Sequence, residues 1–223
     1  MPLLLRHATE ADAPAMAAVA SRAFRDTLSQ ILFPPRLRHL SQEDEEVPWR
    51  AMRTIKRMRD GKVTLVVVDK ADGGDDAPET VVGMAQWVRP VDKDASAPPP
   101  PPAGGPPVAE EPVPATLDSE ALDGFMKLLD EETVKVLGPD GSKHMWYLLV
   151  LTVDPDHHRR GVGGKLLRWG MEQAVAEGRQ AFIHATPEGK HLYEKFGFKS
   201  LGNFDVAGLR HDCMLWSPPP PAA

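Results

Sequence analysis

The sequence has a single cysteine, Cys213, so it cannot form an internal disulfide. A lack of disulfides suits a reducing compartment, and we expect a cytoplasmic protein. No apolar run approaches the roughly 20 residues that a membrane helix needs, and the apolar stretch within residues 1–5 is too short for a secretory signal. We therefore predict neither a membrane partner nor an export signal.

The chain also lacks an excess of basic residues. Its 26 lysines and arginines are outnumbered by 32 acidic residues, which gives a net charge of −6. Nucleic-acid binding needs clustered positive charge to neutralise phosphates, so no nucleic-acid partner is expected. A negative net charge is compatible with a cationic amine as ligand.

Proline is abundant, by contrast, and most of it lies in two tracts. Residues 94–117 combine prolines with almost no large apolar side chains, so this tract cannot bury enough surface to offset the entropy of ordering it. We predict a single domain over residues 1–217, interrupted by a disordered insertion at about 94–117 and followed by a flexible tail at 218–223. A ligand of proline-recognition domains is the functional alternative for the insertion.

Elsewhere, hydrophobic periodicity predicts an alternation of strands and helices. The predicted strands are 3–6, 63–68, 80–87, 146–153, 181–185, 199–206 and 211–216. The predicted helices are 9–24, 48–60, 119–137, 165–177 and one that is capped by Thr186 and ended by Gly197. Residues 25–48 have turn and polar character.

One turn carries most of the functional information. It joins the strand at 146–153 to the helix from Lys165 through glycines and basic residues. Backbone N–H groups at a helix start, with the helix dipole behind them, bind phosphate groups, and glycine lets the phosphate approach closely. A Walker-type loop is excluded because Leu166 follows Lys165, and a dinucleotide fingerprint is excluded because Leu166 replaces its third glycine. The turn predicts a different phosphate-bearing cofactor, with a ligand-free turn as the alternative.

Residues 158–163, HRRGVG, resemble the pyrophosphate-binding motif of the GNAT N-acetyltransferases, with His158 where that family has Gln or Arg. Residues 192–198, LYEKFGF, resemble the Leu-Tyr-x-Lys-x-Gly-Phe signature of a later helix in the same family. Because both motifs occur in the family's order, the chain is identified as similar to GNAT enzymes, in particular to fungal small-molecule types. The resemblance implies an α/β (α+β) GNAT fold: a mixed central sheet of about six to seven strands, about four to five flanking helices and a V-shaped splay at the cofactor site.

The resemblance also implies acetyl-CoA as co-substrate and no metal. It assigns cofactor binding to the end of the central strand, the glycine turn and the cap of the later helix: Leu151, Thr152, Val153, His158, Arg159, Arg160, Gly161, Val162, Gly163, Gly164, Lys165 and Thr186. Tyr193 would act as the general acid that protonates the CoA thiolate.

The general base is not assigned, because the strand 146–153 contains no carboxylate. An alkylamine is mostly protonated at neutral pH, so something must remove its proton. His184, Asp205 and His211 are candidates by strand position, and a water relay or a weakly basic arylamine substrate are the alternatives. The acceptor pocket is expected from aromatic and aliphatic side chains, namely Phe24, Leu28, Phe33, Trp49 and Phe204, whose alternative role is to close the core.

We therefore predict an acyltransferase, an acetyl-CoA-dependent N-acetyltransferase whose small-molecule amine substrate attacks the thioester directly. It would be a monomer or homodimer. One alternative is a protein or peptide N-acetyltransferase, with Glu43–Glu46 contributing to an acidic groove. The other alternative is a non-catalytic acetyl-CoA-binding sensor, which would keep the glycine turn without needing Tyr193.

Overall fold

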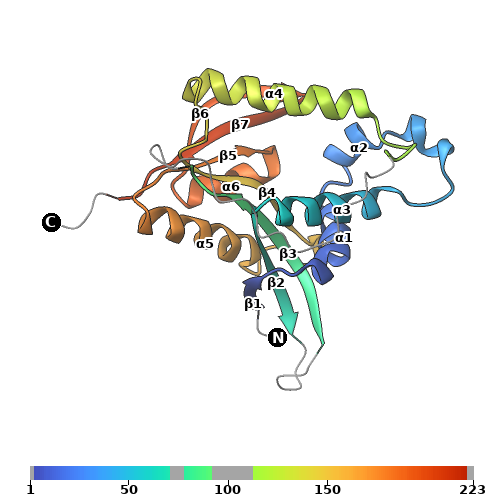
Figure 1. Ribbon diagram of the computed structural model, residues 1–223, viewed down its shortest axis with the longest axis horizontal. Coiled ribbons are helices and arrows are strands. Elements are labelled where there is room, and N and C mark those ends of the chain that lie inside the picture. Colours follow the sequence, from blue (N-terminus) through green and yellow to red (C-terminus); the bar gives the residue numbers. More distant parts are fainter. Residues whose placement is uncertain (1–2, 71–77, 92–112, 220–223) are drawn as a thin grey trace. The chain divides into compact units, whose positions relative to one another are not determined.

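The computed structural model describes residues 3–70, 78–91 and 113–219 (Figure 1). Its seven strands form one sheet in the order β1-β2-β3-β4-β5-β7-β6. The strands are β1 Leu3–His7, β2 Val63–Lys70, β3 Glu79–Val88, β4 Trp146–Val153, β5 Ala181–Ala185, β6 Lys199–Val206 and β7 Leu209–Trp216. The sheet is mixed, because β4 and β5 are parallel whereas β1 with β2 and β7 with both β5 and β6 are antiparallel.

Six α-helices occur among the described residues, one more than expected. They are α1 Ala13–Ala23, α2 Leu28–Leu32, α3 Glu46–Arg59, α4 Ser119–Leu137, α5 Val162–Ala176 and α6 Pro187–Lys195. A mixed seven-stranded sheet flanked by helices confirms the predicted α/β fold. The V-shaped splay and the single-domain organisation stay predictions.

The additional helix, α2, lies in the segment 25–48, for which turn and polar structure was expected. That prediction is wrong because Leu28, Ile31 and Leu32 have helical spacing and pack with Phe33 and Trp49 in one apolar cluster. The insertion predicted at 94–117 falls mostly outside the described residues. Its C-terminal end does not: Thr116 and Leu117 are buried, and Leu117 belongs to the same cluster, so packed structure resumes before residue 117.

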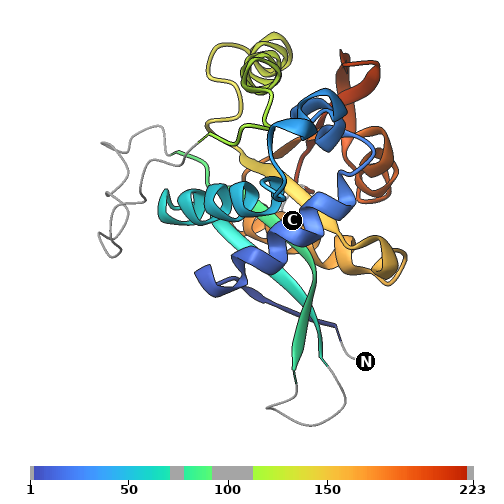
Figure 2. The same ribbon diagram turned by 90° about the vertical axis from the view of Figure 1, so that its right-hand side faces the viewer.

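The described chain packs as two compact units. The first is drawn from Met1–Gln86, Pro99–Leu122 and Val150–Leu166. Within it, α1 and α3 lie side by side (Figures 1 and 2), joined by an apolar cluster around Ala13, Ala17 and Ala51. A capping box precedes α1, where the Thr9 N–H donates to the Asp12 carboxylate at 2.7 Å. Hydrogen bonding from Arg6 lowers the pKa of Asp12 to about 2, so this carboxylate is ionised throughout the neutral range.

The second unit is drawn from Trp87–Pro98, Asp123–Leu149 and Leu167–Ala223. Its core contains three tryptophans in edge-to-face contact, with ring centroids 6.4 Å apart for Trp87 and Trp146 and 5.9 Å apart for Trp146 and Trp169. The glycine at position 170 of α5 faces Trp87, and a Cβ built there would lie 2.2 Å from two of its ring atoms. The close approach of helix and ring therefore depends on the missing side chain.

Candidate active site

The glycine turn follows β4 and leads into α5. Both Arg159 and Gly161 have left-handed backbone, with φ of 59° and 85°. The helix begins at Val162, three residues before the predicted Lys165, and the N–H of Lys165 donates to the Gly161 carbonyl at 3.0 Å. The N–H groups of residues 162–164 thus precede the helix's own hydrogen bonds, at the positive end of its dipole. The corrected boundary brings Gly163 and Gly164 into the first turn, where a phosphate would be held by backbone alone.

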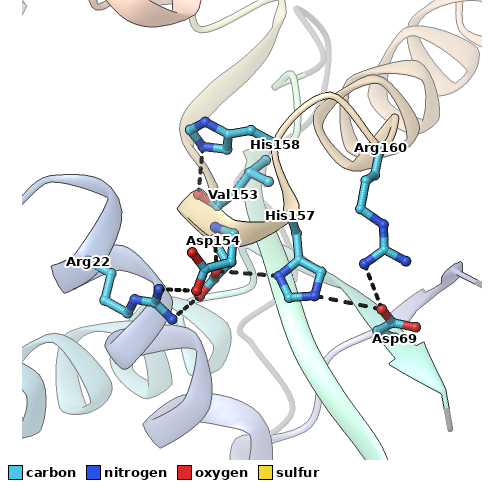
Figure 3. Close-up of polar contacts among 8 residues, drawn as sticks. Arg22, Asp69, Val153, Asp154, His157, His158 and Arg160 are labelled. Carbon is cyan, nitrogen blue, oxygen red and sulfur yellow. Dashed lines mark hydrogen bonds and ion pairs between the residues drawn. The ribbon is translucent and has the colours of Figure 1, made fainter. Parts of the chain in front are cut away.

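Two buried aspartates hold the base of this turn (Figure 3). Arg22 donates to Asp154 at 2.7 Å, and Arg160 donates to Asp69, on β2, at 2.8 Å. The ring of His157 lies between the two carboxylates, 3.4 Å from an oxygen of Asp154 and 3.6 Å from one of Asp69. Buried carboxylates are stable when paired in this way, so the network fixes where the turn leaves the sheet.

The side chains of His157, His158 and Arg160 are occupied by this network and by β4. The guanidinium of Arg160 is directed at Asp69, and the His158 ring donates to the carbonyl of Val153 at 3.3 Å (Figure 3). Asp154 shapes the turn, because its side chain accepts a bond from the N–H of Asp156 at 2.9 Å. The turn therefore offers its backbone amides to a ligand, while the side chains supply rigidity.

The end of β4 alternates in burial. Thr152 is buried, with its hydroxyl unpaired among the described residues, whereas Leu151 and Val153 are half-buried. Opposite this strand end, Gly83 on β3 has no room for a side chain: a Cβ there would lie 2.5 Å from Cγ1 of Val162 and 3.1 Å from the Thr152 carbonyl. The first turn of α5 is thus packed directly against β3.

In the second unit, α6 begins and ends as the sequence predicts. The Thr186 hydroxyl oxygen accepts a bond from the Gly189 N–H at 3.2 Å, and Gly197 ends the helix region with φ of 88°. Tyr193 is buried, and burial raises its pKa above the ordinary value. Its ring fills the space over Gly189, where a Cβ would lie 3.0 Å from Cε2. The phenol is consequently held in one place and kept protonated.

The structure brings together two of the three candidate bases. His184 and His211 both contact Phe204, with ring centroids at 5.7 and 5.6 Å, whereas Asp205 accepts from the Gly208 N–H at 2.7 Å in the exposed β6–β7 turn. Burial, helped by charge repulsion from His211, lowers the pKa of His184 to about 4. A histidine with that pKa is a weak base at neutral pH.

His184 has two partners that the sequence reading missed. Its Nε2 lies 2.9 Å from the Thr133 hydroxyl on α4, and its Nδ1 lies 3.1 Å from the Tyr147 hydroxyl on β4. Tyr147 was read only as a member of an apolar strand. The sequence signal that could have singled it out is the scarcity of tyrosine, since the chain has two.

The expected pocket residues are divided between the units. Phe33 and Trp49 are buried against each other, edge to face at 5.4 Å, and so close the core of the first unit. Phe24 and Leu28 are half-buried, and Arg50 lies 5.5 Å over the Phe24 ring. Phe204 lies in the second unit, where its ring contacts the ring of His184.

Two further kinds of site are absent from the described parts of the chain. No helix there has the length and apolar character to cross a membrane. No group of three or more His, Cys, Asp or Glu side chains is placed there to hold a metal ion.

Comparison with protein families matches residues 116–200 to the acetyltransferase (GNAT) domain. This GNAT segment includes α4, the glycine turn and Tyr193, so both sequence motifs fall inside it. The match therefore supports the predicted resemblance over this part of the chain.

Three known proteins resemble this chain over different lengths. The S-(2-succino)cysteine N-acetyltransferase of Bacillus subtilis is 31% identical over 91 residues, which cover 34% of this chain and 53%, about half, of that protein. An acetyltransferase of Stachybotrys chartarum is 24% identical over 207 residues, covering 91% of this chain and 83% of that protein. The Salmonella typhimurium protein yncA, solved with its cofactor acetyl-CoA, has a TM-score of 0.53 at 16% identity, covering 99% of this chain and 96% of that chain. This last likeness shows a shared GNAT fold.

Proposed function

We propose that this protein transfers the acetyl group of acetyl-CoA to the amine of a small molecule. The observation that carries the proposal is the row of helix-start N–H groups at residues 162–164, inside the matched GNAT segment and fixed by the Asp154 and Asp69 network. The names of two relatives support it: yncA was solved with acetyl-CoA, and the Bacillus enzyme is named for a small amino-acid derivative. The Stachybotrys relative is a fungal protein, and its origin is the support that it gives to a fungal type of enzyme.

The backbone would do most of the cofactor binding. The N–H groups of residues 162–164 take the pyrophosphate oxygens, and the absence of a side chain at Gly161, Gly163 and Gly164 lets the phosphates approach. The half-buried residues Leu151 and Val153 present the strand edge to the pantetheine arm. Thr186 uses its oxygen to cap α6, and its own hydroxyl hydrogen is left to donate to the cofactor.

The chemistry follows the direct route. The amine nitrogen attacks the thioester carbonyl, the new C–N bond forms, the C–S bond breaks and the amine loses a proton. Tyr193 donates to the departing thiolate. Its raised pKa keeps the phenol protonated, and desolvation in the same environment raises the basicity of the thiolate that receives the proton.

Among the candidate bases, the structure favours His211. Its Nδ1 donates to the Leu209 carbonyl at 2.9 Å, so the neutral ring carries its lone pair on Nε2 and can accept a proton there. His184 is the poorer base because burial lowers its pKa to about 4. Asp205 is engaged in the β6–β7 turn.

A small-molecule acceptor is favoured over a peptide by the state of the acidic cluster. Glu45 accepts bonds from both the N–H and the hydroxyl of Thr116, and Glu46 is paired with Arg50 and Ser29. Glu45 and Glu46, two of the four acidic residues at 43–46, are thus already hydrogen-bonded within the first unit and are not open to a basic peptide. We place the reaction in the cytoplasm, consistent with the single, buried thiol.

The proposal is tested with the whole chain in two measurements. Calorimetric titration with CoA should show one binding event, and free thiol should be released from acetyl-CoA with benzylamine, aniline or S-(2-succino)cysteine. Turnover of N-terminal peptides but not of these amines would instead establish the protein N-acetyltransferase alternative. Tight CoA binding without any turnover would leave a sensor, and no CoA binding would refute the whole assignment.

Gly83→Ala should weaken CoA binding about tenfold and lower the free energy of unfolding by about 1–3 kcal/mol. The new methyl would overlap Val162 and press on the Thr152 carbonyl, which moves the first turn of α5 away from its position. Calorimetry and urea denaturation measure the two effects. Unchanged CoA affinity in a folded variant would show that the position of this turn does not matter for binding.

A further inference from the structure

A partly buried ion pair joins helix α6 to strand β7 in the second unit. The ammonium of Lys190, on α6, donates to Oδ1 of Asp212, on β7, at 2.8 Å. The Ser200 hydroxyl, on β6, donates to the same oxygen at 2.7 Å. Asp212 is 3% exposed, so its carboxylate receives both hydrogen bonds inside the fold.

The carboxylate of Asp212 is fixed in place and in charge. Asp212 stands opposite Ala185 of β5 and opposite Asn203 of β6, because β7 runs between these two strands. Burial by itself would raise the pKa of Asp212, but the hydrogen bonds from Lys190 and Ser200, together with nearby positive charge, outweigh it and lower the pKa. The group is therefore an anion throughout the neutral range and holds Lys190 at one point on the sheet.

Two kinds of contact hold α6 against the sheet. Among the residues of α6, all of which the structure describes, Tyr193 is the one that is buried. Its ring contacts Phe198, with centroids 5.9 Å apart, and Phe198 contacts Trp216 of β7 at 6.4 Å. These ring contacts hold the C-terminal half of α6, and the Lys190–Asp212 pair holds the half before it.

The place of Lys190 on α6 links the pair to Tyr193. Residues three apart on a helix are neighbours on its surface, and Lys190 and Tyr193 have this spacing. The Tyr193 ring lies against Gly189, directly before Lys190 in the chain. A contact that fixes the helix at Lys190 therefore also fixes where the Tyr193 hydroxyl lies. A general acid needs such accuracy, because a misplacement of about 1 Å can cost about 100-fold in rate.

We propose that Lys190, Asp212 and Ser200 are positioning residues that hold α6 on β7 and so keep the Tyr193 hydroxyl where it protonates the departing thiolate. This inference rests on the proposed acetyltransferase function and adds to it three residues that neither sequence motif contains. A buried ion pair adds little net stability, because desolvation offsets most of the attraction. Its hydrogen bonds nevertheless have a defined length and direction, which is what the placement of a proton donor requires.

The kinetic test is a double-mutant cycle of Lys190 with Tyr193, read by thiol release from acetyl-CoA with the fastest of the three amine probes. Lys190→Met should lower kcat about tenfold and leave the Kd of CoA within about twofold. Lys190→Arg, which keeps a cationic donor for Asp212, should recover most of that loss. In the Tyr193→Phe background, Lys190→Met should change kcat by less than about twofold, because the group that Lys190 positions is already gone. A merely structural contribution would lower kcat by the same factor in both backgrounds, and that result overturns the proposal.

Lys199→Met is the matched control for charge. It removes a lysine from the exposed start of β6, next to Ser200, and should leave kcat within about twofold. Equal losses of kcat in Lys199→Met and Lys190→Met would show that charge alone matters, which also overturns the proposal. If Lys190→Met does not fold, Ser200→Ala replaces it in the cycle, because Ser200→Ala keeps the ion pair and removes one hydrogen bond to Asp212.

The position of Tyr193 can also be measured without turnover. In proton–carbon NMR spectra of ¹³C-tyrosine-labelled protein, the ring signal of Tyr193 is assigned by its loss in Tyr193→Phe. Lys190→Met should shift or broaden this signal, because the ring moves relative to Gly189 and Phe198, whereas Lys199→Met should leave it unchanged. An unchanged Tyr193 signal in folded Lys190→Met overturns the proposal.

The two proposals fail differently. If the wild type releases no thiol from acetyl-CoA with any amine probe, the acetyltransferase function is refuted, and the Tyr193 signal then decides whether the Lys190–Asp212 pair holds that ring. If thiol is released but Lys190→Met lowers kcat equally with and without the Tyr193 hydroxyl, the function stands and the inference is overturned.

Discussion

Replacing Tyr193 with phenylalanine should lower kcat by about 100-fold and leave the Kd of acetyl-CoA nearly unchanged. The variant loses the proton donor for the departing thiolate, which is needed only once the C–S bond is breaking. Steady-state thiol release gives kcat, and calorimetry with CoA gives the affinity. The ring contact with Phe198, at 5.9 Å, and the filled space over Gly189 are kept by phenylalanine, so the fold should not change.

The raised pKa of Tyr193 sets the pH dependence of this effect. Burial disfavours the phenolate, so the folded-state pKa lies above the ordinary value of about 10, and the phenol stays protonated throughout the neutral range. Deprotonation of Tyr193 should therefore cause no fall in kcat between about pH 6 and pH 9. A limb in that range must come from another group.

Tyr147→Phe is the matched control, since Tyr147 and Tyr193 are the two tyrosines of the chain. It removes one phenolic hydroxyl from the same unit and, unlike Tyr193→Phe, should leave kcat within about twofold. The comparison thus separates the loss of the proposed proton donor from the general effect of removing a tyrosine hydroxyl. If Tyr193→Phe retains full kcat, Tyr193 has no part in the mechanism.

Regular periodic segments were predictable from the sequence, and segments rich in glycine or with short helices were not. The bounds of α4 and β4 agree with the prediction to the residue, because α4 has apolar residues at regular helical spacing and β4 is a nearly continuous apolar run. The start of α5 was placed too late because Gly163 and Gly164 are poor helix formers. Buried packing of Val162 and Leu166 overrides that propensity, and a local reading does not see this packing.

The residues of the candidate site show the same difference between what could and could not be predicted from the sequence. Motif residues such as Tyr193 and the Thr186 cap could be named because their context is local. The network under the turn could not, because Arg22 lies 132 residues from Asp154 and Arg160 lies 91 residues from Asp69. His184 shows the consequence most clearly. Strand position made it a candidate base, whereas burial lowers its pKa to about 4 and its ring is hydrogen-bonded to Thr133, 51 residues away.

Gly170→Ala should cause a large loss of stability, about 1–3 kcal/mol, although alanine is the better helix former. Its Cβ would lie 2.2 Å from two ring atoms of Trp87, a side chain with no exposed surface. That ring cannot retreat easily, because Trp146 packs on it at 6.4 Å and Trp169 packs on Trp146 at 5.9 Å. Urea denaturation followed by far-ultraviolet circular dichroism measures the change in the free energy of unfolding.

Gly124→Ala is the control, because Gly124 also lies within a helix, α4, but is exposed and has nothing within 4 Å of a built Cβ. There the same substitution should stabilise by up to about 1 kcal/mol, the opposite sign, through helix propensity alone. A double-mutant cycle then locates the strain: Trp87→Leu should relieve part of the cost of Gly170→Ala, because it removes the ring that the methyl meets. Stabilisation by Gly170→Ala, or independence of the two substitutions, would mean that the tryptophan cluster can shift to accept the methyl group and does not limit the approach of α5.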